Sequence, residues 1–323
     1  MSEETPLGVL VGRLGAAAPA PPAITCGSET VSRRDFDART NRLARVFQAR
    51  GVTRDSFVTI GLPNGIGFYE AVVATWKLGA TPQPISSRLP AAERSAIIEL
   101  ASPSLVVGVD PQEPPGRATV PVGFVPPPST SADPLPPAIA ASFKAPTSGG
   151  STGRPKLIVA TQAAVWEAVS PFATLLRIPA DGVHLVTGPL YHNGPFITSL
   201  LALLNGNHLV VMPRFEATDC LHLIERHRVD WMYAVPTMMH RIWRLPDAER
   251  TRRDLTSLRV LMHMAAPCPL WLKDAWIDWL GPARVLELYG GTEAQSFTVI
   301  SGEEWLERRG SVVRPVFAEM GVL

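Results

Sequence analysis

Short runs rich in β-branched and aromatic residues alternate with longer segments of helical period, and this alternation limits the fold more than any other feature. A parallel strand pair needs a crossover helix, so the rhythm predicts parallel sheets covered by helices. We therefore expect an α/β protein with doubly wound, largely parallel sheets. Strands are predicted at 57–62, 105–109, 184–187, 208–212, 231–234, 259–262 and 284–288, and helices at 67–78, from about 90, and at 196–204, 218–227, 237–245 and 270–280.

A proline-rich stretch at residues 111–141 interrupts this rhythm and includes three consecutive prolines at 126–128. Proline lacks a backbone donor and fixes φ, so neither a regular helix nor a central strand is expected there. The stretch is predicted to be a long internal connection, and it ends just before the most informative segment of the chain.

Charge and composition exclude several classes of partner. The chain has 30 Lys+Arg against 29 Asp+Glu, a net charge of +1, which gives no general attraction to nucleic acid. The N-terminus lacks the pattern of a signal peptide, and the apolar runs are too short for stable membrane insertion. Cys26, Cys220 and Cys268 are too widely spaced for a disulfide framework or zinc site, so we expect a reduced, cytoplasmic compartment.

Residues 147–156 read Thr-Ser-Gly-Gly-Ser-Thr-Gly-Arg-Pro-Lys. Glycines let backbone N–H groups converge on an anion, hydroxyls add donors, and Lys156 adds a positive charge. Clusters of these residues are more often plain surface turns. A Walker A loop would need lysine directly after the last glycine, whereas Arg154 follows Gly153, and the spacing of a dinucleotide fingerprint is also absent.

The order of this segment resembles the phosphate loop of the adenylate-forming superfamily, which includes acyl-CoA synthetases, luciferases and peptide-synthetase adenylation domains. The match is closest over 151–156, with a Ser-Gly-Gly variant at 148–150. Three later segments resemble further motifs of that family in the expected order. They are Pro-Leu-Tyr-His-Asn-Gly-Pro-Phe at 189–196, His-Met-Ala-Ala-Pro-Cys-Pro at 263–269 and Tyr-Gly-Gly-Thr-Glu at 289–293.

The resemblance implies ATP, Mg²⁺ and CoA as cofactors and co-substrates, with Lys156, His192, Thr292 and Glu293 in catalytic roles. Thr292 would bond the α-phosphate, Glu293 would hold Mg²⁺, and His192 would line the acyl pocket near the reacting carboxylate. Taken alone, Glu293 has a less favoured alternative role as an acid at a helix N-terminus, and apolar residues at these spacings are more often plain core than pocket. The resemblance implies three sets of binding residues. The phosphates of ATP would contact Thr147, Ser148, Gly149, Gly150, Ser151, Thr152, Gly153 and Lys156, and adenine and AMP would contact Ala265, Ala266, Pro267, Glu287, Leu288, Tyr289, Gly290 and Thr292. The acyl pocket would be lined by His192, Phe196, Trp231, Met238, Gly290 and Gly291.

The resemblance covers the chain from about Val31 to its end. Residues 1–323 are therefore expected to be the N-terminal AMP-binding domain, with two packed subdomains, incomplete before the family's β-barrel and C-terminal lid. The ribose-binding aspartate, the hinge and the lid lysine would follow Leu323. We expect a piece of a longer enzyme, and the competing expectation is a naturally short protein that binds nucleotide or acyl-adenylate without turnover.

The expected substrate is a small-molecule carboxylic acid. Amino-acid adenylation is disfavoured, because residues 191–194, Tyr-His-Asn-Gly, lack the aspartate that pairs with a substrate ammonium. The Ser-Gly-Gly variant and Trp-Leu-Lys at 271–273 look most like bacterial CoA ligases for bulky bile-acid, steroid or terpenoid acids. Transfer of the acyl group to a carrier protein in place of CoA, and a homodimer, are left open by the sequence.

Overall fold

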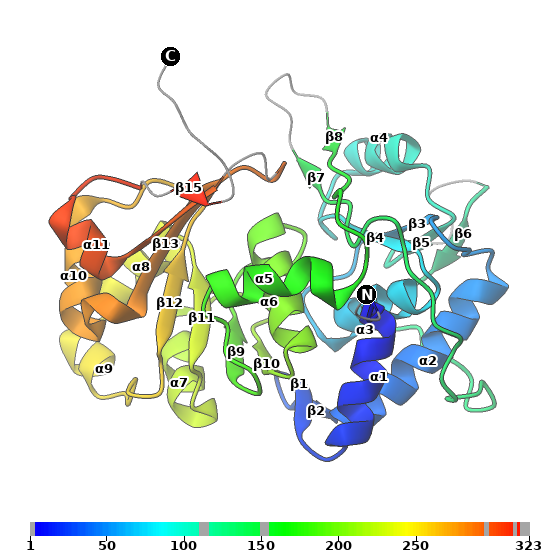
Figure 1. Ribbon diagram of the computed structural model, residues 1–323, viewed down its shortest axis with the longest axis horizontal. Helices are drawn as coiled ribbons and strands as arrows, with labels where there is room; N and C mark the ends of the chain where they lie inside the picture. The colour runs from blue at the N-terminus through cyan, green and yellow to red at the C-terminus, as the bar shows by residue number, and fades with distance from the viewer. Residues whose placement is uncertain (1–3, 110–115, 149–154, 294–296, 313–314, 317–323) are drawn as a thin grey trace.

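The computed structural model describes residues 4–109, 116–148, 155–293, 297–312 and 315–316 (Figure 1). A nine-stranded sheet and a four-stranded sheet lie side by side along the long axis of the molecule, each covered by helices (Figure 1). The predicted α/β class with largely parallel sheets is confirmed. No helix in these described ranges combines the length and apolarity needed to cross a bilayer.

The large sheet has the order β15-β14-β13-β12-β11-β9-β10-β1-β2. Neighbouring strands from β13 to β1 run parallel, whereas β14, β15 and β2 add antiparallel edges. These strands span β1 (Pro22–Cys26), β2 (Glu29–Ser32), β9 (Val183–Val186), β10 (His208–Val211), β11 (Trp231–Ala234), β12 (Val260–His263), β13 (Val285–Gly290), β14 (Phe297–Ser301) and β15 (Pro315–Val316).

Side chains of the central strands alternate between two apolar layers, as the period of a strand requires. Trp231 and Tyr233 of β11 pack into the layer formed with α1, α2, α3, α5 and α6. Met232 and Ala234 pack into the opposite layer, formed with α7, α8 and α10. Both faces of the sheet are therefore covered, which is why its strands are continuous apolar runs in the sequence.

The small sheet is fully parallel, with the order β4-β3-β5-β6. Its strands are β3 (Phe57–Ile60), β4 (Thr81–Pro84), β5 (Leu105–Val107) and β6 (Ala118–Val120). Strand β6 lies inside the stretch 111–141, where neither a regular helix nor a central strand was expected. It pairs on one side only, at the sheet edge, where a proline-rich neighbourhood is tolerated.

Helix α3 (Ile66–Lys77) is buried almost all round. Phe68, Val72 and Trp76 lie on one face of this helix, and Tyr69 and Val73 on other faces are buried as well. The reason is that α1 (Leu7–Ala17) and α2 (Arg33–Ala49), which the sequence analysis did not predict, pack against it. The remaining helices are α4 (Ala91–Ala101), α5 (Trp166–Leu175), α6 (Asn193–Leu204), α7 (Ala217–His227), α8 (Pro236–Trp243), α9 (Asp247–Thr251), α10 (Leu270–Leu280) and α11 (Gly302–Glu307).

Candidate active site

A cavity of about 480 Å³ lies at the carboxyl ends of β9, β11, β12 and β13. The chain runs from β9 to β10 on one side and then returns to β11 on the other, so the strand order reverses between β9 and β11. Open α/β sheets bind ligands in the crevice at such a reversal. The cavity wall includes Gly188 after β9, Val235 after β11, Met264 after β12 and Gly290 at the end of β13.

Helix α6 begins at this cavity because two glycines allow its first turn to approach the sheet. A Cβ on Gly188 would lie 2.5 Å from Cγ of Pro195, and one on Gly194 would lie 3.0 Å from Oη of Tyr233. His192 occupies the position before the helix and lines the cavity. Burial lowers the pKa of His192, so its imidazole is neutral at physiological pH.

The end of β13 supplies the polar part of the wall. Gly290, Gly291, Thr292 and Glu293 all line the cavity. The ring of Tyr289 is 59% exposed beside them, which leaves its face free to stack on a flat ligand. The structure therefore places the residues of the Tyr-Gly-Gly-Thr-Glu motif where a nucleotide could contact them.

The turn after β12 contributes small residues. Ala265 has a left-handed backbone, with φ of 76°, and lines the cavity. Ala266 and Pro267 follow it and are exposed. Small exposed residues at the carboxyl end of a strand leave room for a planar ring against the backbone, and the role of this turn in binding adenine stays a prediction.

Strands β7 (Thr147–Ser148) and β8 (Lys156–Leu157) form a two-stranded antiparallel hairpin. The predicted phosphate-binding residues Gly149, Gly150, Ser151, Thr152 and Gly153 lie outside the described residues. Thr147 is held by Gln83, whose Nε2 donates to Oγ1 over 3.0 Å. Lys156 is exposed and pairs in register with Ser148, which positions both at the base of the predicted loop.

A second cavity, of about 770 Å³, lies between the hairpin and α4 and is lined by Thr147, Ser148 and Pro155. His192, Asn193 and Thr292 line both this cavity and the first one. Three of the four predicted motifs, those at 147–156, 189–196 and 289–293, therefore meet at a junction defined by these three residues.

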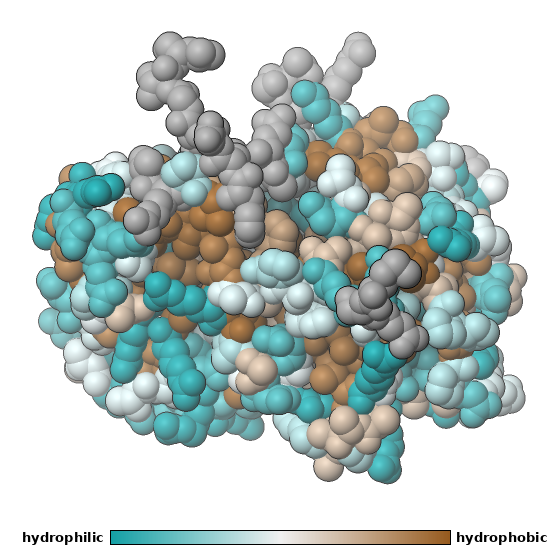
Figure 2. Space-filling model, viewed as in Figure 1, coloured by the Kyte–Doolittle hydropathy of each residue, from teal (hydrophilic) through white to brown (hydrophobic). Residues whose placement is uncertain are grey.

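Apolar surface gathers on the face of the molecule between β13 and α5 (Figure 2). Among the described residues, the first cavity is lined mainly by apolar side chains, with Lys144 and Glu293 as its cation and carboxylate. The described part of the chain contains no cluster of three or more His, Cys, Asp or Glu side chains with metal-binding geometry.

Two predicted acyl-pocket residues lie elsewhere. Trp231 is fully buried, its indole N–H donates to the carbonyl of Leu176 over 2.9 Å, and its ring stacks on His184. Phe196 is fully buried on the inner face of α6 and packs edge-on against Phe68. Both are core residues, because an apolar residue at helical or strand spacing satisfies the core as well as a pocket. Met238 does line the cavity.

Glu287, predicted to contact AMP, is buried and forms an ion pair with Lys273 of α10. Conversely, three cavity-lining residues were not predicted from the sequence: Lys144, Phe172 of α5, and Leu176, which directly follows α5. A lysine within the otherwise uncharged run 138–145 was the one available signal for Lys144.

The fold and this site define an α/β protein with an apolar cavity at the point where the strand order of its large sheet reverses. The chain matches the AMP-binding enzyme family over residues 15–323, and it belongs to that family. It is 28% identical over 312 residues to the long-chain-fatty-acid–CoA ligase FadD13 of Mycobacterium tuberculosis, covering 89% of this chain and 60% of that protein. It is 31% identical over 305 residues to the 2,3-dihydroxybenzoate-AMP ligase of Bacillus subtilis, covering 87% of this chain and 54% of that protein.

Solved structures share the fold. The N-terminal domain of FACL13 from Mycobacterium tuberculosis superposes with a TM-score of 0.80 at 23% identity, covering 96% of this chain and 82% of that one. The o-succinylbenzoate CoA synthetase MenE from Bacillus subtilis superposes with a TM-score of 0.84 at 24% identity, covering 98% and 65%. The chain spans 54–60% of the length of the curated relatives named above.

Proposed function

We propose that this chain binds ATP and a carboxylic acid and forms an acyl-adenylate, the first half of an AMP-forming acyl-CoA synthetase reaction. The observation that carries the proposal is the junction at His192, Asn193 and Thr292, where the apolar cavity meets the cavity of the phosphate hairpin. An acid in the first cavity and a triphosphate reaching into the second would have their reacting groups at this junction. Membership of the AMP-binding enzyme family supports the same reaction.

In the proposed first step, a carboxylate oxygen attacks the α-phosphorus of ATP. A carboxylate–phosphorus bond forms, the bond from the α-phosphorus to the bridging oxygen breaks, and pyrophosphate leaves. The protein contributes positioning and charge neutralisation rather than covalent chemistry. The Thr292 hydroxyl would donate to the α-phosphate and Lys156 would neutralise the leaving phosphates, while the neutral imidazole of His192 lines the space for the carboxylate.

Glu293 and Thr292 fit a magnesium ion, because both present oxygen atoms to the cavity and hard cations prefer oxygen ligands. The carboxylate of Glu293 folds back over Gly291, with Oε2 3.1 Å from where a Cβ on that residue would lie, so a larger residue at 291 would displace it. When bound, Mg²⁺ would withdraw charge from the phosphates.

In the complete enzyme, the thiol of CoA would attack the acyl carbon, AMP would leave, and a thioester would form. FadD13, of which this chain covers 60%, is named a CoA ligase, and this supports CoA as the acceptor. A carrier-protein thiol is the alternative acceptor.

The pocket favours an uncharged acyl group. Phe172, Leu176, Ile197 and Met238 supply apolar surface, and a cavity of about 480 Å³ is within the range that encloses drug-sized molecules. Among the described lining residues, Glu293 is the carboxylate, and it is assigned to the metal, so an amino-acid ammonium would have no partner. These features support a bulky ring or chain acid of the bile-acid, steroid or terpenoid kind.

The test is calorimetric titration of this chain with sulfamoyl analogues of acyl-adenylates, one with a decanoyl and one with a steroid-like acyl group. We expect binding that weakens about tenfold or more in Thr292→Ala, since a hydrogen bond to a charged group contributes about 1.5–3 kcal/mol. Lys156→Ala should also weaken it, whereas Arg54→Ala, which removes an exposed cation from the loop before β3, should not. Equal binding by all four proteins would refute the proposed site.

A protein that binds acyl-adenylate without turnover is the second candidate function. Exchange of labelled pyrophosphate into ATP by this chain, dependent on added acid, would exclude it. The cytoplasm as compartment is also proposed, supported by the three cysteines, which are free thiols in the structure. Cys220 is fully buried, and burial raises its pKa to about 12, which makes it unreactive.

A further inference from the structure

Lysine is rare in this chain, and most of its lysines are buried. It has four lysines among 30 basic residues, and Lys77, Lys144 and Lys273 are each less than a tenth exposed. Burial of an ammonium group is costly unless an anion and hydrogen bonds compensate it. The partner of each buried lysine therefore indicates what that lysine is for.

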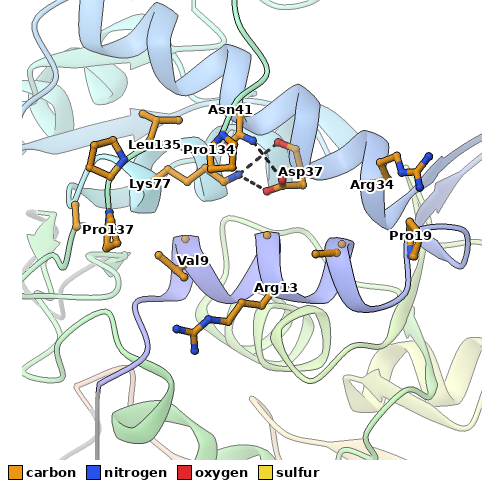
Figure 3. A pocket seen from close by; sticks show the side chains of 16 residues that line it. Val9, Arg13, Pro19, Arg34, Asp37, Asn41, Lys77, Pro134, Leu135 and Pro137 are labelled. Carbon is orange, nitrogen blue, oxygen red and sulfur yellow. Dashed lines mark hydrogen bonds and ion pairs between the residues drawn. The ribbon is translucent and has the colours of Figure 1, made fainter.

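Two of these lysines have carboxylate partners within the protein. Lys77 donates to Asp37 Oδ1 and to Asn41 Oδ1, each over 2.5 Å, at a cavity between α1, α2 and residues 134–138 (Figure 3). Lys273 forms its ion pair with Glu287 between α10 and β13. Both charges are compensated where they lie, so both lysines have a structural role.

Lys144 has no such partner among the described residues. Its ammonium donates to the amide oxygen of Asn193 and lies 5.4 Å from the ring centroid of Phe143. Lys144 is 5% exposed, it lines the first cavity, and no described carboxylate is within ion-pair distance of it. Burial without an anion lowers the pKa of Lys144 to about 8.

The position of Lys144 increases its need for an anion. Its hydrogen-bond partner Asn193 is the first residue of α6, whose first turn has no acidic residue and no side-chain cap. The amino end of a helix carries a partial positive charge, which disfavours a neighbouring cation and favours an anion. Two positive features therefore converge on one point of the cavity wall.

That point belongs to the junction of the two cavities, because Asn193 lines both of them. We propose that Lys144 binds the reacting carboxylate of the substrate and holds it at the junction for attack on the α-phosphorus. The inference rests on the proposed function and identifies the cation that this function requires. A fixed ammonium offsets the repulsion between the carboxylate and the triphosphate, which otherwise opposes their approach.

The test compares acids with their uncharged amides in the absence of nucleotide. Benzoate, decanoate and cholate are each titrated against their primary amides by calorimetry. We expect at least one acid to bind the wild-type protein about tenfold or more tightly than its amide, as a charge-assisted hydrogen bond implies. Lys144→Met should bring that ratio close to one, and Lys144→Arg should keep part of it. The matched control, Lys77→Met with Asp37→Asn, should leave the ratio unchanged.

Thermal unfolding of the ligand-free proteins gives an independent readout. Lys144→Met should raise the midpoint because it removes an uncompensated buried cation, whereas a lysine that only supports the fold would lower it on removal. The proposal is overturned if no acid is preferred over its amide by the wild-type protein, if Lys144→Met retains the preference, or if it lowers the midpoint. AMP is titrated separately, and its failure to bind would count against the proposed function alone.

Discussion

The ion pair between Lys273 and Glu287 connects α10 to β13, the strand that carries the nucleotide motif. The side chains are 1% and 10% exposed, Lys273 Nζ lies 4.8 Å from the ring centroid of Trp305, and His263 Nε2 lies 3.9 Å from the carboxylate. Burial lowers the pKa of Lys273, although Glu287 opposes this shift. Methionine at 273 would keep much of the aliphatic length and remove the charge.

We expect Lys273→Met to reduce the free energy of unfolding by about 3–5 kcal/mol, because it leaves a buried carboxylate without its cation. The double variant Lys273→Met with Glu287→Gln should recover most of this loss, since neither charge then remains. Urea unfolding followed by tryptophan fluorescence measures both values, and the four proteins of the cycle give the coupling energy between the two side chains.

The same double variant tests the reassignment of Glu287. Because the carboxylate of Glu287 pairs with Lys273 and not with the nucleotide, the AMP affinity of the double variant should differ from that of the wild-type protein by less than about threefold. A loss of less than about 1 kcal/mol in Lys273→Met would refute the reasoning about the buried pair. A well-folded double variant with AMP binding weakened more than about tenfold would show that Glu287 contacts the nucleotide after all.

Three further outcomes are expected. Affinity for an acid should fall about tenfold per pH unit above pH 8, where Lys144 loses its proton. Burial lowers the pKa of His192 and raises the pKa of Tyr233, so neither group titrates between pH 7 and 9. Calorimetry over that range would therefore follow Lys144. Glu293→Gln should abolish the Mg²⁺ dependence of ATP binding with little change in thermal midpoint, and persistence of that dependence would reject Glu293 as the ligand. Trp231→Leu should cost about 2–4 kcal/mol in urea unfolding without altering the ratio of acid to amide binding, because the indole is core.

The sequence predicted the central strands well because both faces of the sheet are covered, which makes each strand a short apolar run. It did not predict β4, whose Thr-Pro-Gln-Pro sequence has two prolines and no apolar alternation. That strand is stabilised by pairing with β3 at the edge of the sheet, and this tertiary contact cannot be predicted from the local sequence. The first two helices were also missed, although Ser32 caps α2 by accepting from the backbone N–H of Asp35.

For the site, linear motifs predicted which backbone segments would converge, because glycines and short polar residues there serve the ligand rather than the core. Side-chain roles that depend on long-range partners were not predictable. Glu287 is next to the nucleotide motif in sequence, yet its partner is on α10. Lys144 and Asn193 are 49 residues apart, and no periodic pattern relates them. Phe196 and Trp231 were placed in the pocket because apolar periodicity does not distinguish a core side chain from a pocket side chain.

The two cavities share His192, Asn193 and Thr292 among their lining residues, and the rest of each wall consists of different residues. Substitutions in separate, non-contacting sites usually have additive effects on free energy. Changes at Phe172 or Leu176 could therefore alter the choice of acid while nucleotide affinity stays constant. The acyl pocket and the proposed nucleotide site can in this sense be changed separately. A library of variants confined to α5 and the residue that follows it would test new acyl groups while the proposed nucleotide site stays unchanged.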